Sequence, residues 1–189
     1  MFSFINNFLA HVEQQTVDMS SSTNSDGQKK DQQQKKEEKK YLERVRDVFM
    51  FQCFTGLRYS DVENLKQSDI KDNFIEIITV KTSDSLIIEL NDHSRAILEK
   101  YKDEVYEKSK ALPVISNQKM NEYLRELMEM AEIDEPIRET YYKGNQKFDE
   151  VSPKYALMSS HAGRRTFICN ALALGIPPQV VMKWTGHSD

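Results

Sequence analysis

Residues 35–54, KKEEKKYLERVRDVFMFQCF, decide the fold, because their apolar residues recur at helical spacing. The side chains expected on the buried side of this helix are Leu42, Val45, Val48, Phe49, Phe51 and Phe54. Thr55 and Gly56 follow, and glycine is typical of a helix end because it tolerates a positive φ. The pattern predicts one long helix that ends before Gly56.

A second, shorter helix is expected in residues 59–70, YSDVENLKQSDI, where Ser60 and Glu63 match the S-x-x-E pattern of a capping box. The turn between the two helices carries Arg58. We therefore expect the Arg58 guanidinium to emerge where the second helix begins.

Residues 73–90, NFIEIITVKTSDSLIIEL, alternate apolar and polar side chains on both sides of a polar centre. The apolar positions of the alternation are Ile75, Ile77, Leu86 and Ile88. This period of two predicts a β-hairpin with Lys81 near its tip.

The rest of the chain is expected to add helices at residues 93–108, 116–133, 161–174 (stopped by Gly175) and from Pro177 onward. The inward side of the first of these helices is assigned to Ala96, Ile97, Leu98, Tyr101 and Val105. Residues 136–152 contain the turn Lys143-Gly144-Asn145 and predict a short hairpin. The expected fold class is mainly α with a small antiparallel β-sheet (α+β).

The front of the chain is expected to differ from the rest. Residues 2–14 predict a short amphipathic helix, and residues 18–34 are polar and low in complexity, which favours a flexible linker. The expected organisation is therefore a segment at 1–36, made of this helix and the flexible stretch, followed by one domain at 37–189.

Charge and cysteine content limit the possible functions. The net charge is −4, from 26 Lys and Arg against 30 Asp and Glu, so binding to a polyanion would depend on a local patch. Cys53 and Cys169 both stand in apolar runs and are expected to be reduced, buried thiols. The sequence predicts neither a signal peptide nor a membrane span, which favours a cytoplasmic protein.

Candidate functional residues begin with Arg58 and Asp61, which are three apart on a helix and share a face. A guanidinium oriented by a carboxylate is a good phosphate clamp, although an ordinary surface salt bridge has the same spacing. His161 and Arg164 have that spacing too, and the alternative for them is a capping histidine followed by two solvent arginines, Arg164 and Arg165. The core-type positions expected after them are Phe167, Ile168, Ala171 and Leu172.

Two further candidates are His187, which follows a helix-ending glycine, and Lys81 at the hairpin tip. Each could equally lie in solvent without a function. Taken together, two arginines, one lysine and two histidines can surround one phosphodiester. Phosphoryl transfer spreads charge over the equatorial oxygens, so fixed donors supply most of the catalysis.

At this point the sequence resembles the tyrosine recombinases, the family that includes the integrases of phages and conjugative transposons. The first arginine motif is matched by Thr55-Gly56-Leu57-Arg58, and the hairpin lysine by Lys81 in VKT. The H-x-x-R motif is matched by His161 to Arg164, and the G-H motif by Gly186-His187. The resemblance covers residues from about 40 to the end, and it implies the catalytic-domain fold of DNA breaking-rejoining enzymes.

The resemblance implies site-specific DNA recombination and integration, with strand cleavage and rejoining through a 3′-phosphotyrosyl intermediate, without cofactor or metal. By the matched positions, Arg58 and Arg164 clamp the non-bridging oxygens, and His161 and His187 assist as donors. Lys81 protonates the leaving 5′ oxygen, and Asp61 supports Arg58. The implied partner is double-stranded DNA, on which the full-length protein assembles as a tetramer over paired sites, in the bacterial cytoplasm.

The nucleophilic tyrosine of the family follows the G-H motif, and this chain has no tyrosine there. All its tyrosines precede His161, namely Tyr41, Tyr59, Tyr101, Tyr106, Tyr123, Tyr141, Tyr142 and Tyr155. We therefore expect a catalytic domain cut before its nucleophile and itself inactive for cleavage, with Tyr59 as a packing residue. The alternatives are a type IB topoisomerase-like enzyme and a noncatalytic DNA-binding protein that retains the phosphate pocket.

Overall fold

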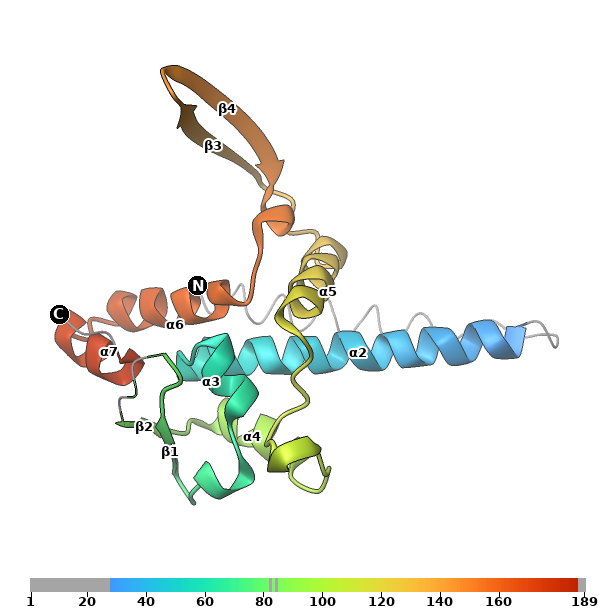
Figure 1. Cartoon of the computed structure of the whole chain (residues 1–189), viewed down its shortest axis with the longest axis vertical. Helices are drawn as coiled ribbons and strands as arrows, with labels where there is room; N and C mark the ends of the chain where they lie inside the picture. Colours follow the sequence, from blue (N-terminus) through green and yellow to red (C-terminus); the bar gives the residue numbers. More distant parts are fainter. Residues whose placement is uncertain (1–27, 82, 84, 187–189) are drawn as a thin grey trace. The chain divides into compact units, whose positions relative to one another are not determined.

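The computed structural model describes residues 28–186 apart from 82 and 84 (Figure 1). The chain divides into two compact units, Met1–Leu42 with Asn121–Ser159 and Glu43–Met120 with Ser160–Asp189. Both consist of helices with a two-stranded antiparallel sheet, so the predicted fold class is confirmed. The helix predicted at residues 2–14 lies outside the described residues.

The long helix α2 spans Gln28–Thr55 and supplies residues to both units. It begins inside the predicted flexible linker, so that prediction is wrong for residues 28–34. Gln and Lys are good helix formers, and extending an existing helix by one residue is much easier than starting a new one. Low hydrophobicity therefore did not exclude a helix here.

The core of the second unit is formed by the C-terminal half of α2 and the elements that follow it. The buried side chains include Val48, Phe49, Phe51, Leu57, Val62, Leu65, Ile75, Ile77, Leu86 and Ile88. Helix α3 spans Tyr59–Asn64 and is followed by the short helix η1, Gln67–Asp69. Its N-cap is Arg58, and Ser60 lies within its first turn, so the predicted capping box of Ser60 and Glu63 is wrong.

Strands β1, Phe74–Ile78, and β2, Ser85–Glu89, form the predicted hairpin, with Lys81 in the turn region between them. Ile75 faces Ile88 and Ile77 faces Leu86 in the register, and all four are buried. The hairpin prediction is confirmed. The alternation of apolar and polar residues was sufficient because it determines which face of the hairpin is buried.

Helix α4 spans only Asp92–Tyr101, and a short helix η2 follows at Glu107–Ser109. The predicted continuation of this helix to residue 108 is wrong. The predicted burial of Ala96 and Val105 is also wrong, because both are exposed and the exposed fraction of Val105 is 97%. Leu98 and Tyr101 are buried as expected. Val105 is the single apolar residue in the next turn, too little to pack another turn of helix.

Helices α6, His161–Ala173, and α7, Pro178–Thr185, confirm the last two predicted helices. The predicted core is confirmed at Ala171, whereas Leu172 is 42% exposed. Cys53 is buried as predicted, and burial raises the pKa of its thiol to about 12. Cys169 is exposed, so its predicted burial is wrong, because it projects from the side of α6 away from the core.

The first unit contains most of α5, Asn117–Met130, where Tyr123 stacks on Tyr41 of α2. Strands β3, Pro136–Lys143, and β4, Gln146–Pro153, then form the second predicted hairpin, which the short helix η3, Lys154–Leu157, follows (Figure 1). The two-residue turn between β3 and β4 contains Gly144, which has a φ of 61°. None of the helices in the described part of the chain is long and apolar enough to cross a membrane.

Candidate functional site

Arg58 is positioned by the tight turn between α2 and α3. Gly56 has a φ of 71°, and a Cβ atom there would lie 2.6 Å from Cδ1 of Phe167, so only glycine fits the turn without displacement. Arg58 follows as the N-cap of α3 with an extended backbone. Its Nη2 donates to the carbonyl of Gly186 at 3.1 Å, while Nη1 is buried and has no hydrogen-bond acceptor among the described residues. One edge of the guanidinium is therefore fixed to the protein.

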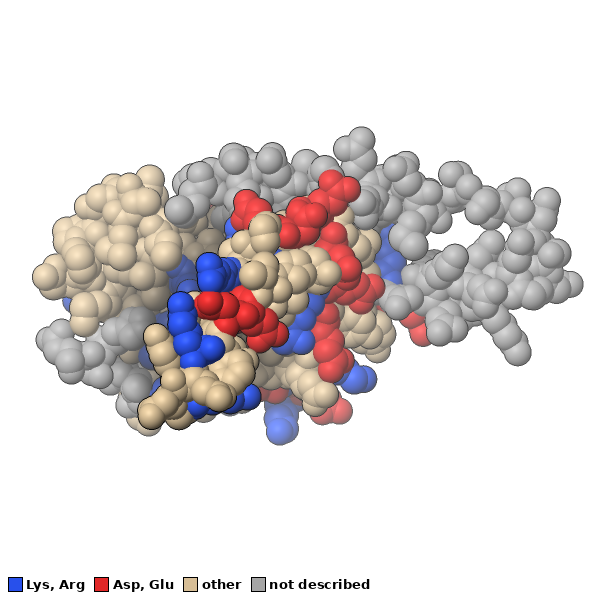
Figure 2. Space-filling view, turned by 90° about the horizontal axis from the view of Figure 1, so that it is seen from above, with Lys and Arg blue, Asp and Glu red and all other residues tan. Residues whose placement is uncertain are grey.

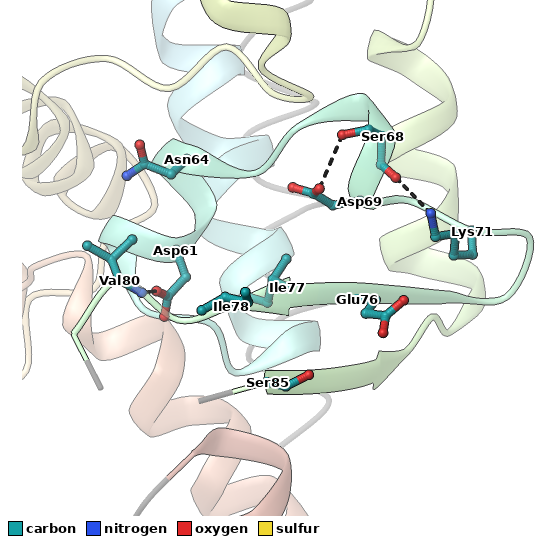
Figure 3. A pocket seen from close by; sticks show the side chains of 10 residues that line it. All are labelled: Asp61, Asn64, Ser68, Asp69, Lys71, Glu76, Ile77, Ile78, Val80 and Ser85. Carbon is teal, nitrogen blue, oxygen red and sulfur yellow. Dashed lines mark hydrogen bonds between the residues drawn. The ribbon is translucent and has the colours of Figure 1, made fainter. Parts of the chain in front are cut away.

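Asp61 links α3 to the β1–β2 hairpin. Its side chain is fully buried, and Oδ1 accepts a hydrogen bond from the backbone N–H of Val80 at 3.0 Å (Figure 3). Its Oδ2 lies 3.9 Å from Nη1 of Arg58, an ion-pair distance that is too long for a hydrogen bond. The expected support of Arg58 by Asp61 is thus electrostatic, and Asp61 also holds the backbone next to Lys81.

Arg164 differs from the surface arginine of the alternative interpretation, because it is only 2% exposed. Its Nη1 donates to the carbonyl of Gly56 at 2.9 Å, and its Nη2 donates to the carbonyl of Thr185. Burial and, after it, the charge of Arg58 lower the pKa of Arg164 to about 10, with Asp61 opposing both effects. Arg164 therefore remains a cation at neutral pH.

His161 is the exposed first residue of α6. Partial burial lowers its pKa below the usual value near 6.5, and the positive charges of Arg164, Arg165, Arg58 and Lys81 lower it further. His161 is therefore neutral at pH 7 and offers one N–H donor. Four cations that act on one imidazole create a positive potential that favours an anion.

Lys81 is exposed in the turn region after β1, where the N–H of Ser83 donates to the carbonyl of Thr79 at 3.0 Å. The structure thus pairs Arg58 with Asp61, and the charges of both act on Arg164. The charges of Arg58, Arg164 and Lys81 in turn act on His161. His187 lies outside the described residues, and its role stays a prediction. The preceding residue, Gly186, ends α7 in the left-handed conformation.

Gln52 belongs to the site although sequence reasoning did not select it. Its side chain is completely buried, and Nε2 donates to the carbonyl of Leu57 at 3.3 Å, within the turn that leads to Arg58. A Cβ atom on Gly163 of α6 would lie 2.9 Å from the Cβ of Gln52, so the two helices approach closely here. The available signal was a lone amide within the apolar run VFMFQCF.

A hollow of about 480 Å³ opens beside the hairpin (Figure 3). Of the described candidates, only Asp61 lines it, and the other charged side chains around it are Asp69, Lys71 and Glu76. Three carboxylates against one ammonium disfavour a phosphate. We therefore place the candidate anion site at the arginines and not in this hollow. Among residues 28–186, as far as they are described, no cluster of His, Cys, Asp and Glu could hold a metal ion.

Comparisons with known proteins identify the family and the fold of this chain. The sequence profile of the phage integrase family matches residues 29–189. Among solved structures, XerA recombinase is similar with a TM-score of 0.58 and 16% identity, over 77% of this chain and 48% of that one. The lambda integrase catalytic core has a TM-score of 0.54 and 17% identity, over 77% of this chain and 82% of that one.

The Tn1549 transposon integrase, solved in complex with circular intermediate DNA, has a TM-score of 0.51 and 15% identity, over 78% of this chain and 51% of that one. At these identities, the similarity shows the fold. The chain spans about half the length of XerA recombinase. No curated protein sequence matches it.

Proposed function

Because the chain belongs to the phage integrase family, the tyrosine recombinases, we propose that it serves site-specific DNA recombination by cleaving and rejoining DNA strands through a 3′-phosphotyrosyl intermediate. The observation that carries this proposal is the convergence of Arg58, Arg164 and Asp61, whose contacts join the ends of α2 and α7 to the start of α3. Such fixed donors suit a phosphate whose charge grows in the transition state.

The arginines bind the phosphate in this proposal. Arg58 offers Nη1, a buried donor without an acceptor among the described residues, to a non-bridging oxygen. Arg164 is held by its bonds to the carbonyls of Gly56 and Thr185, and its buried positive charge attracts the phosphate. His161, neutral at pH 7, donates one further hydrogen bond, and His187 is proposed to assist it.

Lys81 is the proposed general acid. Attack by a tyrosine oxygen, whose proton passes to solvent, forms a bond to phosphorus and breaks the bond from phosphorus to the 5′ oxygen, which takes a proton from the ammonium group of Lys81. In the reverse step, the 5′ hydroxyl of a partner strand attacks the phosphotyrosine and returns its proton to Lys81, while the bond from phosphorus to the tyrosine oxygen breaks and that oxygen regains a proton from solvent. Asp61 fixes the N–H of Val80 and thereby the start of the Lys81 turn.

We propose that none of the chain's own tyrosines is the nucleophile. The hydroxyl of Tyr59 donates to the carbonyl of Ile115, as expected for a packing residue, and burial together with the charge of Glu63 raises its pKa to about 12. The hydroxyl of Tyr101 is bound to the carboxylate of Asp47, and that of Tyr106 is bound to Glu104. A hydroxyl held in this way and with a raised pKa is a poor nucleophile.

The proposed partner is double-stranded DNA, on which the protein assembles as a tetramer. A lambda integrase structure of similar fold, with a TM-score of 0.52, is a tetramer bound to a Holliday junction. The positive potential around His161 supports a DNA phosphate as ligand, despite the net charge of −4.

A nicked suicide DNA substrate tests the proposal, because cleavage releases a short strand and traps the covalent protein–DNA adduct. We expect no adduct from the 189-residue chain and an adduct from a protein that continues past Asp189 through the next tyrosine encoded by its gene. In that longer protein, Arg58→Ala should reduce trapping by orders of magnitude, because it removes a phosphate donor.

Arg165→Ala is the matched control, because Arg165 is an exposed neighbour on α6 and the same charge is lost. Arg165 adds only to the positive potential around His161 and is assigned no bond to the phosphate, so we expect a loss of trapping much smaller than that of Arg58→Ala. If the longer protein binds DNA without forming an adduct, the function is noncatalytic DNA binding. If Arg58→Ala and Arg165→Ala trap DNA equally well, the role assigned to Arg58 is wrong.

A further inference from the structure

The β3–β4 hairpin of the first unit is exposed on both faces. Every residue from 138 to 151 is solvent-exposed, including large apolar and aromatic side chains. Tyr142 is 68% exposed and Val151 is 64% exposed. Exposed side chains of this size on one element commonly mark a surface for a partner.

The tip of this hairpin, residues 141–148, is positively charged. Its sequence YYKGNQKF contains Lys143 and Lys147 and no acidic residue. The acidic residues Glu139, Asp149 and Glu150 lie further from the turn, and Asp149 is engaged by Arg138 and Thr140. Acidic and basic side chains are interspersed on the face that Figure 2 shows. The tip is therefore a local cationic site in a protein with net negative charge.

The aromatic residues of the tip hold Lys143 in place. Tyr141 and Phe148 are cross-strand partners, and their rings stack with centroids 5.6 Å apart and an interplanar angle of 13°. The Nζ atom of Lys143 lies 5.7 Å from the centroid of the Tyr141 ring and 5.8 Å from that of Phe148. A cation held over two rings loses less side-chain entropy when it binds an anion than a free lysine does.

From these observations, and resting on the proposed function, we infer that the tip of the β3–β4 hairpin is a second DNA contact, in which Lys143 and Lys147 bind backbone phosphates of double-stranded DNA. A two-stranded ribbon fits the major groove of B-DNA, which is about 12 Å wide. Lys147 lies 3.7 Å from Asp149, a weak and exposed ion pair that a phosphate can replace. This contact positions the DNA without reading its sequence.

Fluorescence anisotropy tests the contact with the 189-residue chain and a labelled 30-base-pair duplex of arbitrary sequence. The dissociation constant Kd is measured between 50 and 200 mM KCl for the unchanged chain and for Lys143→Gln/Lys147→Gln. Loss of two phosphate contacts should lower the slope of log Kd against log salt by about 1.8. Over this fourfold range of salt, the fold-increase in Kd should therefore be about 12 times smaller for the variant than for the unchanged chain.

The control variant Lys102→Gln/Lys108→Gln removes the same charge from two exposed positions, and Lys102 is already ion-paired with Glu99. We expect it to keep the slope of the unchanged chain. Equal slopes for all three proteins, an equal loss in both variants, or no binding by the unchanged chain would overturn the inference. Self-association without DNA that disappears in the tip variant, measured by sedimentation, would overturn it in favour of a second copy as partner.

The outcome is separable from that of the proposed function. The tip contact fails if the salt slope does not change, whatever the longer protein does on the suicide substrate. The phosphotyrosyl chemistry fails if no adduct forms, even when DNA binding depends on Lys143 and Lys147.

Discussion

Replacing Gly56 by alanine should destabilise the second unit by two separable effects. The first is conformational, because the φ of 71° lies in the left-handed region, which costs a residue with a Cβ atom about 1–2 kcal/mol. The second is steric, because the new Cβ would lie 2.6 Å from Cδ1 of Phe167 and 3.0 Å from its Cε1. Forcing an extra carbon into a packed site costs about 1–3 kcal/mol.

The sum is a loss of about 2–5 kcal/mol in the free energy of unfolding. Gly175→Ala isolates the first effect, because Gly175 has a φ of 81° and a Cβ there would have no neighbour within 4 Å. That variant should lose only about 1–2 kcal/mol. Urea unfolding followed by the fluorescence of Trp184, the single tryptophan, measures both losses. Trp184 also reports on the site, because its ring lies 6.4 Å from that of Phe167.

The contact itself is tested by Phe167→Leu in the Gly56→Ala background. The smaller side chain should recover part of the steric loss, so the two substitutions should be non-additive by more than about 0.5 kcal/mol. Equal losses for Gly56→Ala and Gly175→Ala, together with additivity at Phe167, would refute the claim that the ring of Phe167 requires glycine in the Arg58 turn.

Two other predictions concern titratable groups. A thiol reagent at pH 8 should modify one cysteine per native chain, the exposed Cys169, because burial raises the pKa of Cys53 to about 12. In urea, the reagent should modify both cysteines. Rapid modification of two thiols in the native chain would contradict the buried position of Cys53. The pKa of His161 is lowered in the folded chain. Below the unfolded pKa near 6.5, the unfolded chain therefore binds more protons than the folded chain, and the free energy of unfolding decreases as the pH decreases. His161→Gln should therefore lose less stability than the unchanged chain between pH 7 and pH 5.5 in urea titrations, and parallel losses would show that His161 does not titrate abnormally.

The spacing of apolar residues in the sequence predicted the elements in which the buried side chains recur at that same spacing. The β1–β2 hairpin is the clearest example, because alternation alone placed Ile75 and Leu86 on the buried face and Lys81 in the turn region. The extent of α4 was not predictable in this way, since helical spacing continues to Val105 although nothing packs on that residue. The early start of α2 was missed for the opposite reason, because a helix can continue without burying apolar side chains.

The candidate site shows the same division. The spacing of Arg58 and Asp61 identified a real ion pair, at 3.9 Å, although α3 is capped by Arg58 and not by the predicted Ser60. The burial of Arg164 was not predictable from spacing, because an arginine three residues after a histidine resembles a solvent-exposed side chain. Its burial depends on the carbonyl of Gly56, 108 residues away in the sequence, and on that of Thr185.

The hydrogen bonds of the two arginines also explain why the separate sequence motifs occur together. Arg58 donates to the carbonyl of Gly186, and Arg164 donates to the carbonyl of Thr185, so both guanidinium groups bind consecutive residues at the end of α7. Arg164 binds Gly56 as well, which ties the turn before Arg58 to that same helix end. The backbone of Thr185 and Gly186, directly before His187 in the sequence, is therefore held by the two arginines proposed to bind the phosphate. The arginine turn, the H-x-x-R helix and the G-H end are joined by these bonds, so a change in one displaces donors in the other two.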